Sequence, residues 1–319
     1  MRRVSVIVPT YNRPLTLREA LASIRALDRV YDEIEFEVVV GDNGLTDATR
    51  ELCEEFGAVY APAPGRGASY ARNAALKAAT GDFIGFLDDD DAWLPGHIRP
   101  HLAYLDAHPE HDAVFGQAIS TDEHLRPTGE PWPQEDPGTG DELTRTMLSG
   151  LFPQLGTVIV RKSAADRIGY FDPSLIGGQD LDWLLRLASK KKLGHIQSPC
   201  ILFRGRAPGT SSDALQRMRI GFDCKVFLRH GLPIAHRMWK SPLAFIRAYH
   251  ASLFHYYQYF SRKAMQCAAA DGAIRDLAEA LAPLVLYLPL LLLSDFVRPS
   301  PLRKAVIGRL LRRDPTMAG

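Results

Sequence analysis

Four consecutive acidic residues, Asp88 to Asp91, directly follow a short apolar stretch at residues 83–87. That stretch has the length and composition of a strand buried on both faces. Four adjacent carboxylates repel one another, and a hard divalent cation that also binds phosphate oxygens would relieve the repulsion. The run therefore predicts either a Mg²⁺ or Mn²⁺ site for a phosphate-bearing ligand or a solvated acidic turn in which Asp91 caps the next helix.

The segments that must position this acidic run alternate between strand-like and helix-like patterns. Strands are expected at residues 4–8, 35–40, 57–61 and 83–87, with helices beginning near 16, 47 and 69. This order predicts parallel strands joined by crossover helices, in which ligands gather at the carboxyl ends of the strands. No G-x-G-x-x-G fingerprint follows the first strand, which argues against a dinucleotide site.

The next segments continue the α/β pattern. A turn-rich loop is expected at residues 9–14, with Thr16 opening the first helix in a capping box. Further along, the pattern predicts a helix at 94–107, a strand at 112–119, a mobile polar loop at 120–140, a helix at 179–190, a strand at 196–203 and a basic loop at 204–212. A long polar loop of this kind is often found near a functional site.

Composition excludes several classes of protein. The 319-residue chain carries a formal net charge of +1, so no bulk electrostatic attraction to nucleic acid is expected. The four cysteines are scattered, without a CxxC pair or a His/Cys cluster of zinc spacing, so a thiolate metal site is not expected. Scattered cysteines and the lack of a signal-peptide pattern fit the cytosol.

Beyond residue 213 helical patterns dominate, which predicts a second, helical region at 213–319 after a first domain at 1–212. Its apolar run at 281–293 is shorter than a membrane span and is interrupted by Pro283 and Pro289. A basic amphipathic segment follows at 301–313. Together they favour peripheral contact with the cytosolic face of the membrane; a helical cap on the sheet or a dimer contact is the alternative.

Five motifs in order add a family resemblance. They are residues 4–12 (VSVIVPTYN), 38–47 (VVVGDNGLTD), 67–75 (GASYARNAA), 86–95 (FLDDDDAWLP) and 179–188 (QDLDWLLRLA). Together they resemble the family 2 glycosyltransferases of GT-A fold, over about residues 3–212. The resemblance implies a Rossmann-like, mostly parallel mixed sheet with flanking helices.

The resemblance also implies roles for individual residues. The implied nucleotide-binding residues are Pro9, Thr10, Asn12, Asp42, Gly67, Arg72 and Asp88. Asp90 resembles the last aspartate of the family's D-x-D motif, which holds Mn²⁺ or Mg²⁺ through the diphosphate, and Asp180 resembles the general base. Three of these residues also have a structural alternative. Asp42 could be a turn residue, Arg72 the partner of a surface acid and Asp180 a helix N-cap.

The chain departs from the family pattern at three positions. Relatives usually carry an acid at Gly41 and Glu at Gln179, and many have His near Ala207. Gln179 is therefore expected to bind the acceptor by hydrogen bonding alone. Two upstream arginines, Arg204 and Arg206, are expected to assist the diphosphate.

The resulting expectation is a metal-dependent, inverting glycosyltransferase of cell-envelope polysaccharide synthesis. The donor is expected to be a nucleotide sugar, most readily a UDP-sugar, and the acceptor a hydroxyl of a glycan or lipid-linked saccharide. Two alternatives remain open. One is a catalytically silent nucleotide-sugar binding protein, and the other is a sugar nucleotidyltransferase, which normally needs a Gly-rich loop after the first strand.

Overall fold

The computed structural model describes residues 1–65, 67–148, 151–175, 177–190 and 192–205, together with Val226 and Arg229. The predicted helical region at 213–319, its membrane contact and the predicted role of Arg206 lie outside the described residues. Among the helices that are described, none has the length and apolar character needed to cross a bilayer.

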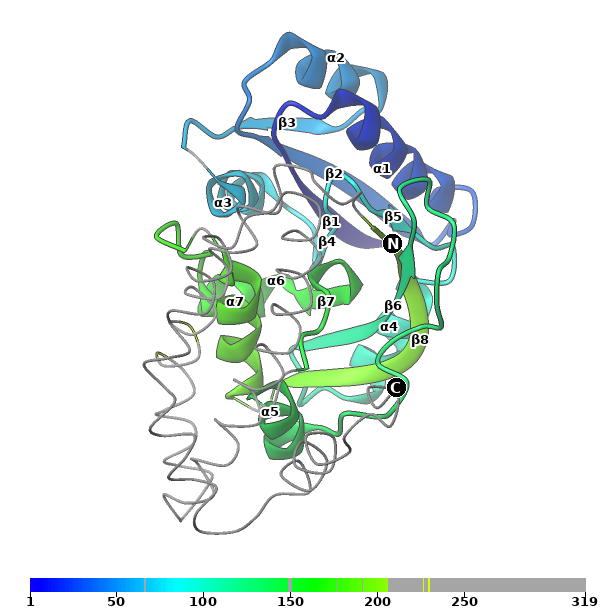
Figure 1. Ribbon diagram of the computed structural model, residues 1–319, viewed down its shortest axis with the longest axis vertical. Helices are drawn as coiled ribbons and strands as arrows, with labels where there is room; N and C mark the ends of the chain where they lie inside the picture. The colour runs from blue at the N-terminus through cyan, green and yellow to red at the C-terminus, as the bar shows by residue number, and fades with distance from the viewer. Residues whose placement is uncertain are drawn as a thin grey trace, which may run out of the picture.

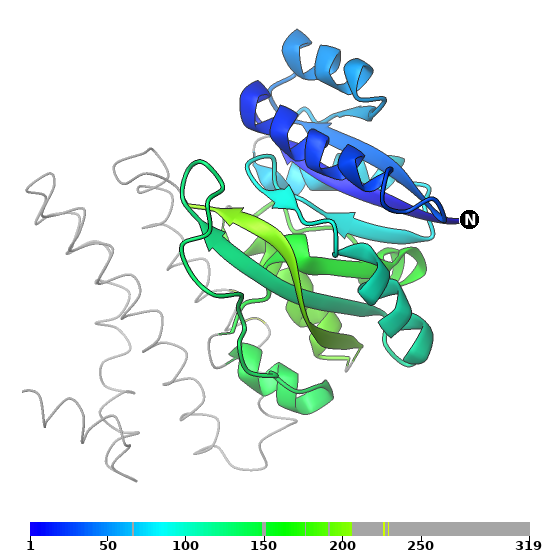
Figure 2. The same cartoon turned by 90° about the vertical axis from the view of Figure 1, so that its right-hand side faces the viewer.

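Eight strands form one sheet in the order β3-β2-β1-β4-β7-β6-β8-β5. The strands are β1 (Arg2–Thr10), β2 (Ile34–Asp42), β3 (Val59–Pro62), β4 (Phe83–Phe86), β5 (Ala92–Trp93), β6 (Ala113–Thr121), β7 (Val158–Arg161) and β8 (Leu193–Arg204). The first four are parallel, β7 runs antiparallel to β4 and β6, and β8 is parallel to β6. The expected mostly parallel, mixed sheet is confirmed, and Figure 2 shows its twist from β1 to β8.

Helices cover both faces of this sheet (Figure 1). They are α1 (Pro14–Leu27), α2 (Asp47–Glu55), α3 (Ala68–Ala78), α4 (Ile98–Ala107), α5 (Gly140–Leu148), α6 (Lys162–Ile168) and α7 (Gln179–Ala188), with a 3-10 turn at Leu155–Thr157. One apolar core joins α1, α2 and α4 to the sheet, and the other joins α3, α5, α6 and α7. In α1 the helical spacing of Leu17, Leu21 and Ile24 buries all three, each contributing roughly 2 kcal/mol.

Two expected boundaries were wrong near Asp88–Asp91, at the carboxyl edge of the parallel strands, which we call the acidic edge. Pro9 and Thr10 do not begin a loop but complete β1, because they pair in register with Gly41 and Asp42 of β2. Helix α1 then begins at Pro14, whose fixed backbone suits a first helical position, with Arg13 at the N-cap and no Thr16 capping box.

The segment after the acidic run also differs from expectation. Ala92 and Trp93 pair with β8, so α4 begins only at Ile98 and Asp91 does not cap it. Instead Asp91 accepts a hydrogen bond from the Arg204 backbone N–H at 2.9 Å. The polar segment at 120–140 is held to β6 by reciprocal backbone bonds between Ala118 and Trp132, both 2.9 Å.

Candidate functional site

The acidic run leaves the sheet at the carboxyl edge of its parallel half. The Leu87 N–H donates to the carbonyl of Ile7 at 3.0 Å, which extends the β4–β1 pairing up to the first aspartate. Thr10 lies in register with Asp42 at the end of β2. The ends of three adjacent strands therefore surround one place on the sheet, as the sequence predicts for a ligand site.

Within the run the four aspartates divide into two kinds. Oxygen atoms of Asp88, Asp90 and Asp91 lie within 4.8 Å of one another, and such an all-oxygen donor set fits Mg²⁺ or Mn²⁺. Asp89 turns toward β1 and accepts from Thr10 Oγ1 at 2.7 Å. Burial raises the pKa of Asp89 to about 6, although the nearby Arg13 offsets part of the rise.

Arg13 also contacts the acidic run, a role that no motif in the sequence predicts. Its Nη1 donates to Asp89 Oδ1 and to Asp90 Oδ2, both at 3.1 Å. The side chain is 45% exposed, so this cation covers the acidic run from the solvent side. The signal available in sequence was a basic residue just beyond β1, opposite an acidic run at the end of the neighbouring strand.

Arg72 reaches the run from α3. Its Nη2 donates to Asp88 Oδ1 at 2.6 Å although the residue is only 4% exposed. Its guanidinium lies over the Phe171 ring at 5.5 Å. The Nε and Nη1 atoms are buried and have no hydrogen-bond partner among the described residues. A buried arginine with unused donors is suited to an anionic ligand. Its partner is Asp88 of the acidic run and not an unrelated surface acid.

The start of α3 adds partial positive charge to the same edge. Helix α3 follows β3 through a short connection, so its N-terminal N–H groups lie on the carboxyl side of the sheet. Gly67 at its N-cap has φ +107°, a conformation that side-chain-bearing residues rarely adopt. Such a helix start favours a phosphate group.

Asp42 holds the loop after β2. It is fully buried, and it accepts from the N–H groups of Gly44 at 2.7 Å and Thr46 at 3.2 Å and from the Tyr60 hydroxyl at 3.3 Å. These contacts support the turn-residue alternative. The neighbouring Gly41 leaves no room for an acidic side chain, because a Cβ there would lie 2.0 Å from the carbonyl oxygen of Ala71.

Asn12 lies beside this loop. Its backbone is left-handed at φ +53°, and its Oδ1 would lie 2.1 Å from a Cβ built on Gly44. The loops after β1 and β2 are therefore in close contact, and Gly44 permits it. Tyr11, between Thr10 and Asn12, is 59% exposed.

The beginning of α7 is pinned to the acidic edge by aromatic packing. Trp183 meets Phe86, the last residue of β4, edge-on at 5.4 Å between ring centroids. Asn73 of α3 exchanges two hydrogen bonds with the Phe171 backbone, at 2.8 and 2.9 Å. These contacts place the first turn of α7, with Gln179 and Asp180, on the same side of the sheet as α3.

Gly178 in a left-handed conformation, and not Asp180, is the N-cap of α7. Asp180 Oδ1 accepts from the Leu181 N–H at 2.9 Å. The Gln179 Oε1 atom is buried and has no hydrogen-bond partner among the described residues. Asp182 is buried against Arg186 and Arg229, at 3.1 and 3.5 Å, which gives it a structural role.

Arg204 is surrounded by protein acceptors. Its Nε donates to the Asp90 carbonyl and its Nη1 to the Glu123 carbonyl, both at 2.5 Å, and its Nη2 pairs with Glu19. Together with its N–H bond to Asp91, these contacts tie the end of β8 to the acidic run. Direct contact with a diphosphate would require Arg204 to leave these partners.

Comparison with known proteins gives a family match. The description "Glycosyl transferase family 2" matches residues 5–169, just over half of the chain. Glycosyltransferase AglE of Haloferax volcanii is 25% identical over 194 residues, which cover 57% of this chain and 60% of AglE. The poly(ribitol-phosphate) beta-N-acetylglucosaminyltransferase TarS of Staphylococcus aureus is 35% identical over 118 residues, which cover 34% of this chain and 20% of TarS. The chain thus spans less than two thirds of either relative.

Solved structures share the fold. TarS residues 1–349 in complex with UDP-GlcNAc superpose with a TM-score of 0.59 at 20% identity, covering 88% of this chain and 80% of that one. The mannosyltransferase PcManGT from Pyrobaculum calidifontis, in complex with GDP-Man and Mn²⁺, gives a TM-score of 0.55 at 20% identity, covering 98% and 88%. The expected GT-A architecture is confirmed.

Proposed function

Because the chain belongs to glycosyl transferase family 2, we propose that it transfers a sugar from a nucleoside diphosphate sugar to an acceptor hydroxyl. One observation carries the proposal: the carboxylates of Asp88, Asp90 and Asp91 converge beside the buried, partly unpartnered guanidinium of Arg72. Oxygen ligands for a divalent cation and donors for an anion lie at one sheet edge, which is what a metal-bound diphosphate requires.

The donor is a UDP-sugar bound together with Mn²⁺ or Mg²⁺. Asp90 is the principal ligand of this cation. The fold neighbours with UDP-GlcNAc and with GDP-Man and Mn²⁺ support a nucleotide-sugar donor, and the first of them supports a UDP-sugar. When bound, the cation supplies Lewis-acid neutralisation of the departing diphosphate. Asp88 binds either the ribose of the donor or a water molecule on the metal. Its hydrogen bond from Arg72 keeps it oriented before the donor arrives.

Residues at the ends of β1 and β2 form the base and ribose side. Pro9 and Thr10 bring β1 to the edge, and Asn12 contacts the loop after β2. Asp42 acts on the base through the loop that it holds, since direct contact with the base would need this buried carboxylate to be uncovered. Gly67 lets the chain turn into α3, whose first N–H groups and Arg72 then receive the diphosphate.

Transfer proceeds by direct displacement with inversion at the anomeric carbon. Asp180 accepts the proton of the attacking hydroxyl as the new glycosidic bond forms. Gln179 offers its buried, unpartnered oxygen to the acceptor as a hydrogen-bond acceptor. Arg204 keeps Asp90 and Asp91 in place rather than touching the diphosphate.

The acceptor is a glycan or a lipid-linked saccharide of the cell envelope, made on the cytosolic side. The relative TarS carries poly(ribitol-phosphate), a hydroxyl-bearing polymer, in its name. Peripheral contact with the membrane by residues 213–319 would bring the site to such acceptors.

Nucleotide-sugar binding tests the proposal directly. Thermal unfolding of the full chain is followed with UDP-, GDP- and dTDP-sugars, with and without Mn²⁺. A ligand at 100 times its dissociation constant stabilises the folded state by about 2.7 kcal/mol. We expect a Mn²⁺-dependent rise in melting temperature for the wild type and no such rise for Asp90→Asn. The control is Asp166→Asn, at an exposed position of α6, which should show the same rise as the wild type.

Two outcomes would contradict the proposal. One is the absence of any shift and of any hydrolysis with every nucleotide sugar. The other is tight binding without turnover over a broad acceptor panel, which would instead favour a silent binding protein.

A further inference from the structure

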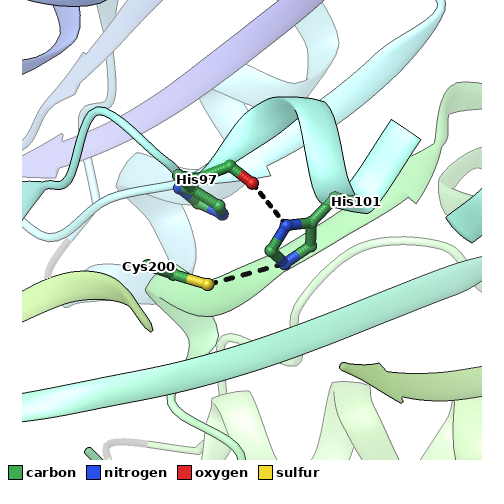
Figure 3. Close-up of side chains that lie close together, drawn as sticks. All are labelled: His97, His101 and Cys200. Carbon is green, nitrogen blue, oxygen red and sulfur yellow. Dashed lines mark hydrogen bonds between the residues drawn. The ribbon is translucent and has the colours of Figure 1, made fainter. Parts of the chain in front are cut away.

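A second group of ligand-type side chains lies away from the acidic run, in the core between α4 and β8. It consists of His97, His101 and Cys200, which we call the histidine–cysteine cluster (Figure 3). One donor atom from each residue lies within 4.8 Å of the others, and all three residues are completely buried. The sequence did not predict a thiolate metal site, because the cysteines are scattered. Cys200 is 99 residues from His101 along the chain, so the two do not form a recognisable motif.

The geometry at His101 and Cys200 matches a metal-binding pair. In a tetrahedral zinc site with bonds of about 2.0 Å to nitrogen and 2.3 Å to sulfur, the nitrogen–sulfur edge is about 3.5 Å. The observed distance from His101 Nε2 to Cys200 Sγ is 3.7 Å. Residue 116 must be glycine to allow this, because a Cβ there would lie 2.2 Å from the sulfur.

His101 is also oriented as a ligand. Its Nδ1 lies 2.6 Å from the His97 carbonyl oxygen (Figure 3). With the ring proton on Nδ1, donation to this carbonyl leaves a lone pair on Nε2, which is the usual arrangement of metal-binding histidines. The lone pair on Nε2 then faces both Cys200 and the Thr157 carbonyl oxygen, which lies 2.9 Å away. A neutral ring cannot donate to both carbonyls.

His97 gives independent evidence for cation binding at this cluster. Both of its ring nitrogens are buried and make no hydrogen bond of normal geometry among the described residues, although the Thr157 backbone is close enough to raise the pKa of the ring against the larger effect of burial, which lowers it. Its ring is packed edge-on against Trp93 at 4.4 Å and against His101 at 4.6 Å. Leaving a polar ring buried and unsatisfied is costly, and a cation bound at one nitrogen removes much of that cost.

From these contacts we propose that the histidine–cysteine cluster is a structural Zn²⁺ site. His97, His101 and the Cys200 thiolate are three ligands, and the adjacent Thr157 carbonyl oxygen is the fourth. Nitrogen and sulfur donors select Zn²⁺, whereas the acidic run selects harder cations. Binding displaces the Cys200 thiol proton to solvent. Because the cluster has no exposed atom to receive a metal, zinc enters as the chain folds.

The proposed zinc would fasten the segment that carries the acidic run. It would join the start of α4 to β8, and β8 also pairs with β5, immediately after Asp91. Trp93 of β5 packs on His97 and donates to the Gly156 carbonyl at 3.0 Å. The site is separate from sugar transfer, and its test does not depend on activity.

Metal content and a Co²⁺ spectrum of the full chain test this proposal. Protein produced with zinc in the medium and purified without chelator should hold about one zinc per chain. Refolding with Co²⁺ in place of Zn²⁺ should give a thiolate-to-cobalt charge-transfer band in the near ultraviolet, which carboxylates do not produce. Cys200→Ser should lose the band and the zinc, and refolding with a chelator should lower the melting temperature.

Cys53→Ser is the matched control, because Cys53 is also buried and free but lies on α2. It should retain both zinc and the cobalt band. If Cys200→Ser does not fold, the wild-type cobalt spectrum decides. Wild-type protein without stoichiometric zinc or without the charge-transfer band would overturn the proposal, as would a Cys200→Ser variant that keeps both.

Discussion

Arg13 Nη1 lies 3.1 Å from Asp90 Oδ2, so the carboxylate that we assign to the metal forms an ion pair with a side chain of the protein. The same nitrogen contacts Asp89. Arg13 therefore partly neutralises two of the four adjacent acids, and it competes with a divalent cation for Asp90.

Replacing Arg13 should therefore strengthen metal binding in the absence of nucleotide. A half-exposed ion pair is worth up to about 1 kcal/mol, so Arg13→Ala should tighten Mn²⁺ binding by about two- to five-fold in a paramagnetic-resonance titration. Arg18→Ala, which breaks an exposed pair with Glu55, is the control and should change nothing. Weaker Mn²⁺ binding by Arg13→Ala would show that Arg13 supports the site instead of competing for it.

Asp180→Asn should separate chemistry from donor binding. Loss of a general base costs roughly 10²- to 10⁴-fold in rate, and the carboxamide keeps the size of the side chain. We expect transfer to fall by that factor in a radiolabelled-sugar assay, while the thermal shift with donor and Mn²⁺ stays as in the wild type. Full transfer by Asp180→Asn would refute the base assignment.

Gly41→Ala should destabilise the fold. Its Cβ would lie 2.0 Å from the backbone oxygen of Ala71, which cannot rotate away, so the loss should be about 3 kcal/mol or more in urea unfolding. Gly96→Ala has nothing within 4 Å of the added carbon and should be neutral or slightly stabilising. Equal stability of the two variants would contradict the close approach of β2 and α3.

Glu37 should make stability depend on pH. It accepts hydrogen bonds from the Thr80 N–H at 2.7 Å, from Thr80 Oγ1 at 2.6 Å and from Ser5. Burial raises the pKa of Glu37, but these hydrogen bonds outweigh it and hold the pKa below its ordinary 4.5. The stabilisation is therefore present above pH 4.5 and is lost as the pH falls through the lowered value.

Glu37→Gln should accordingly reduce the free energy of unfolding by roughly 2 kcal/mol at pH 7. The difference from the wild type should shrink in acid. Glu35→Gln, on the same strand, removes only an exposed pair with Arg3 and should cost little at either pH. A Glu37→Gln deficit that is independent of pH would mean that shape, rather than charge, matters at this position.

The local sequence pattern was sufficient to predict the strands and helices whose formation depends on residues close together in the sequence. The alternation of β-branched runs and helical spacing predicted the parallel half of the sheet, since burial on a sheet or helix requires those periods. The position of Asp88–Asp91 after β4 followed from the same reasoning. Boundaries failed at Pro9, Thr10 and the start of α4, where pairing with another strand outweighed turn and helix propensity.

Contacts between distant segments were decided only by the tertiary structure. Nothing local in the sequence shows that Arg72 is buried against Asp88 or that Arg13 spans two of the acids, because each depends on how a helix and a neighbouring strand end meet. The histidine–cysteine cluster is the clearest case. His97 and His101 are one helical turn apart and readable as a pair, but only the docking of α4 on β8 brings Cys200 to them.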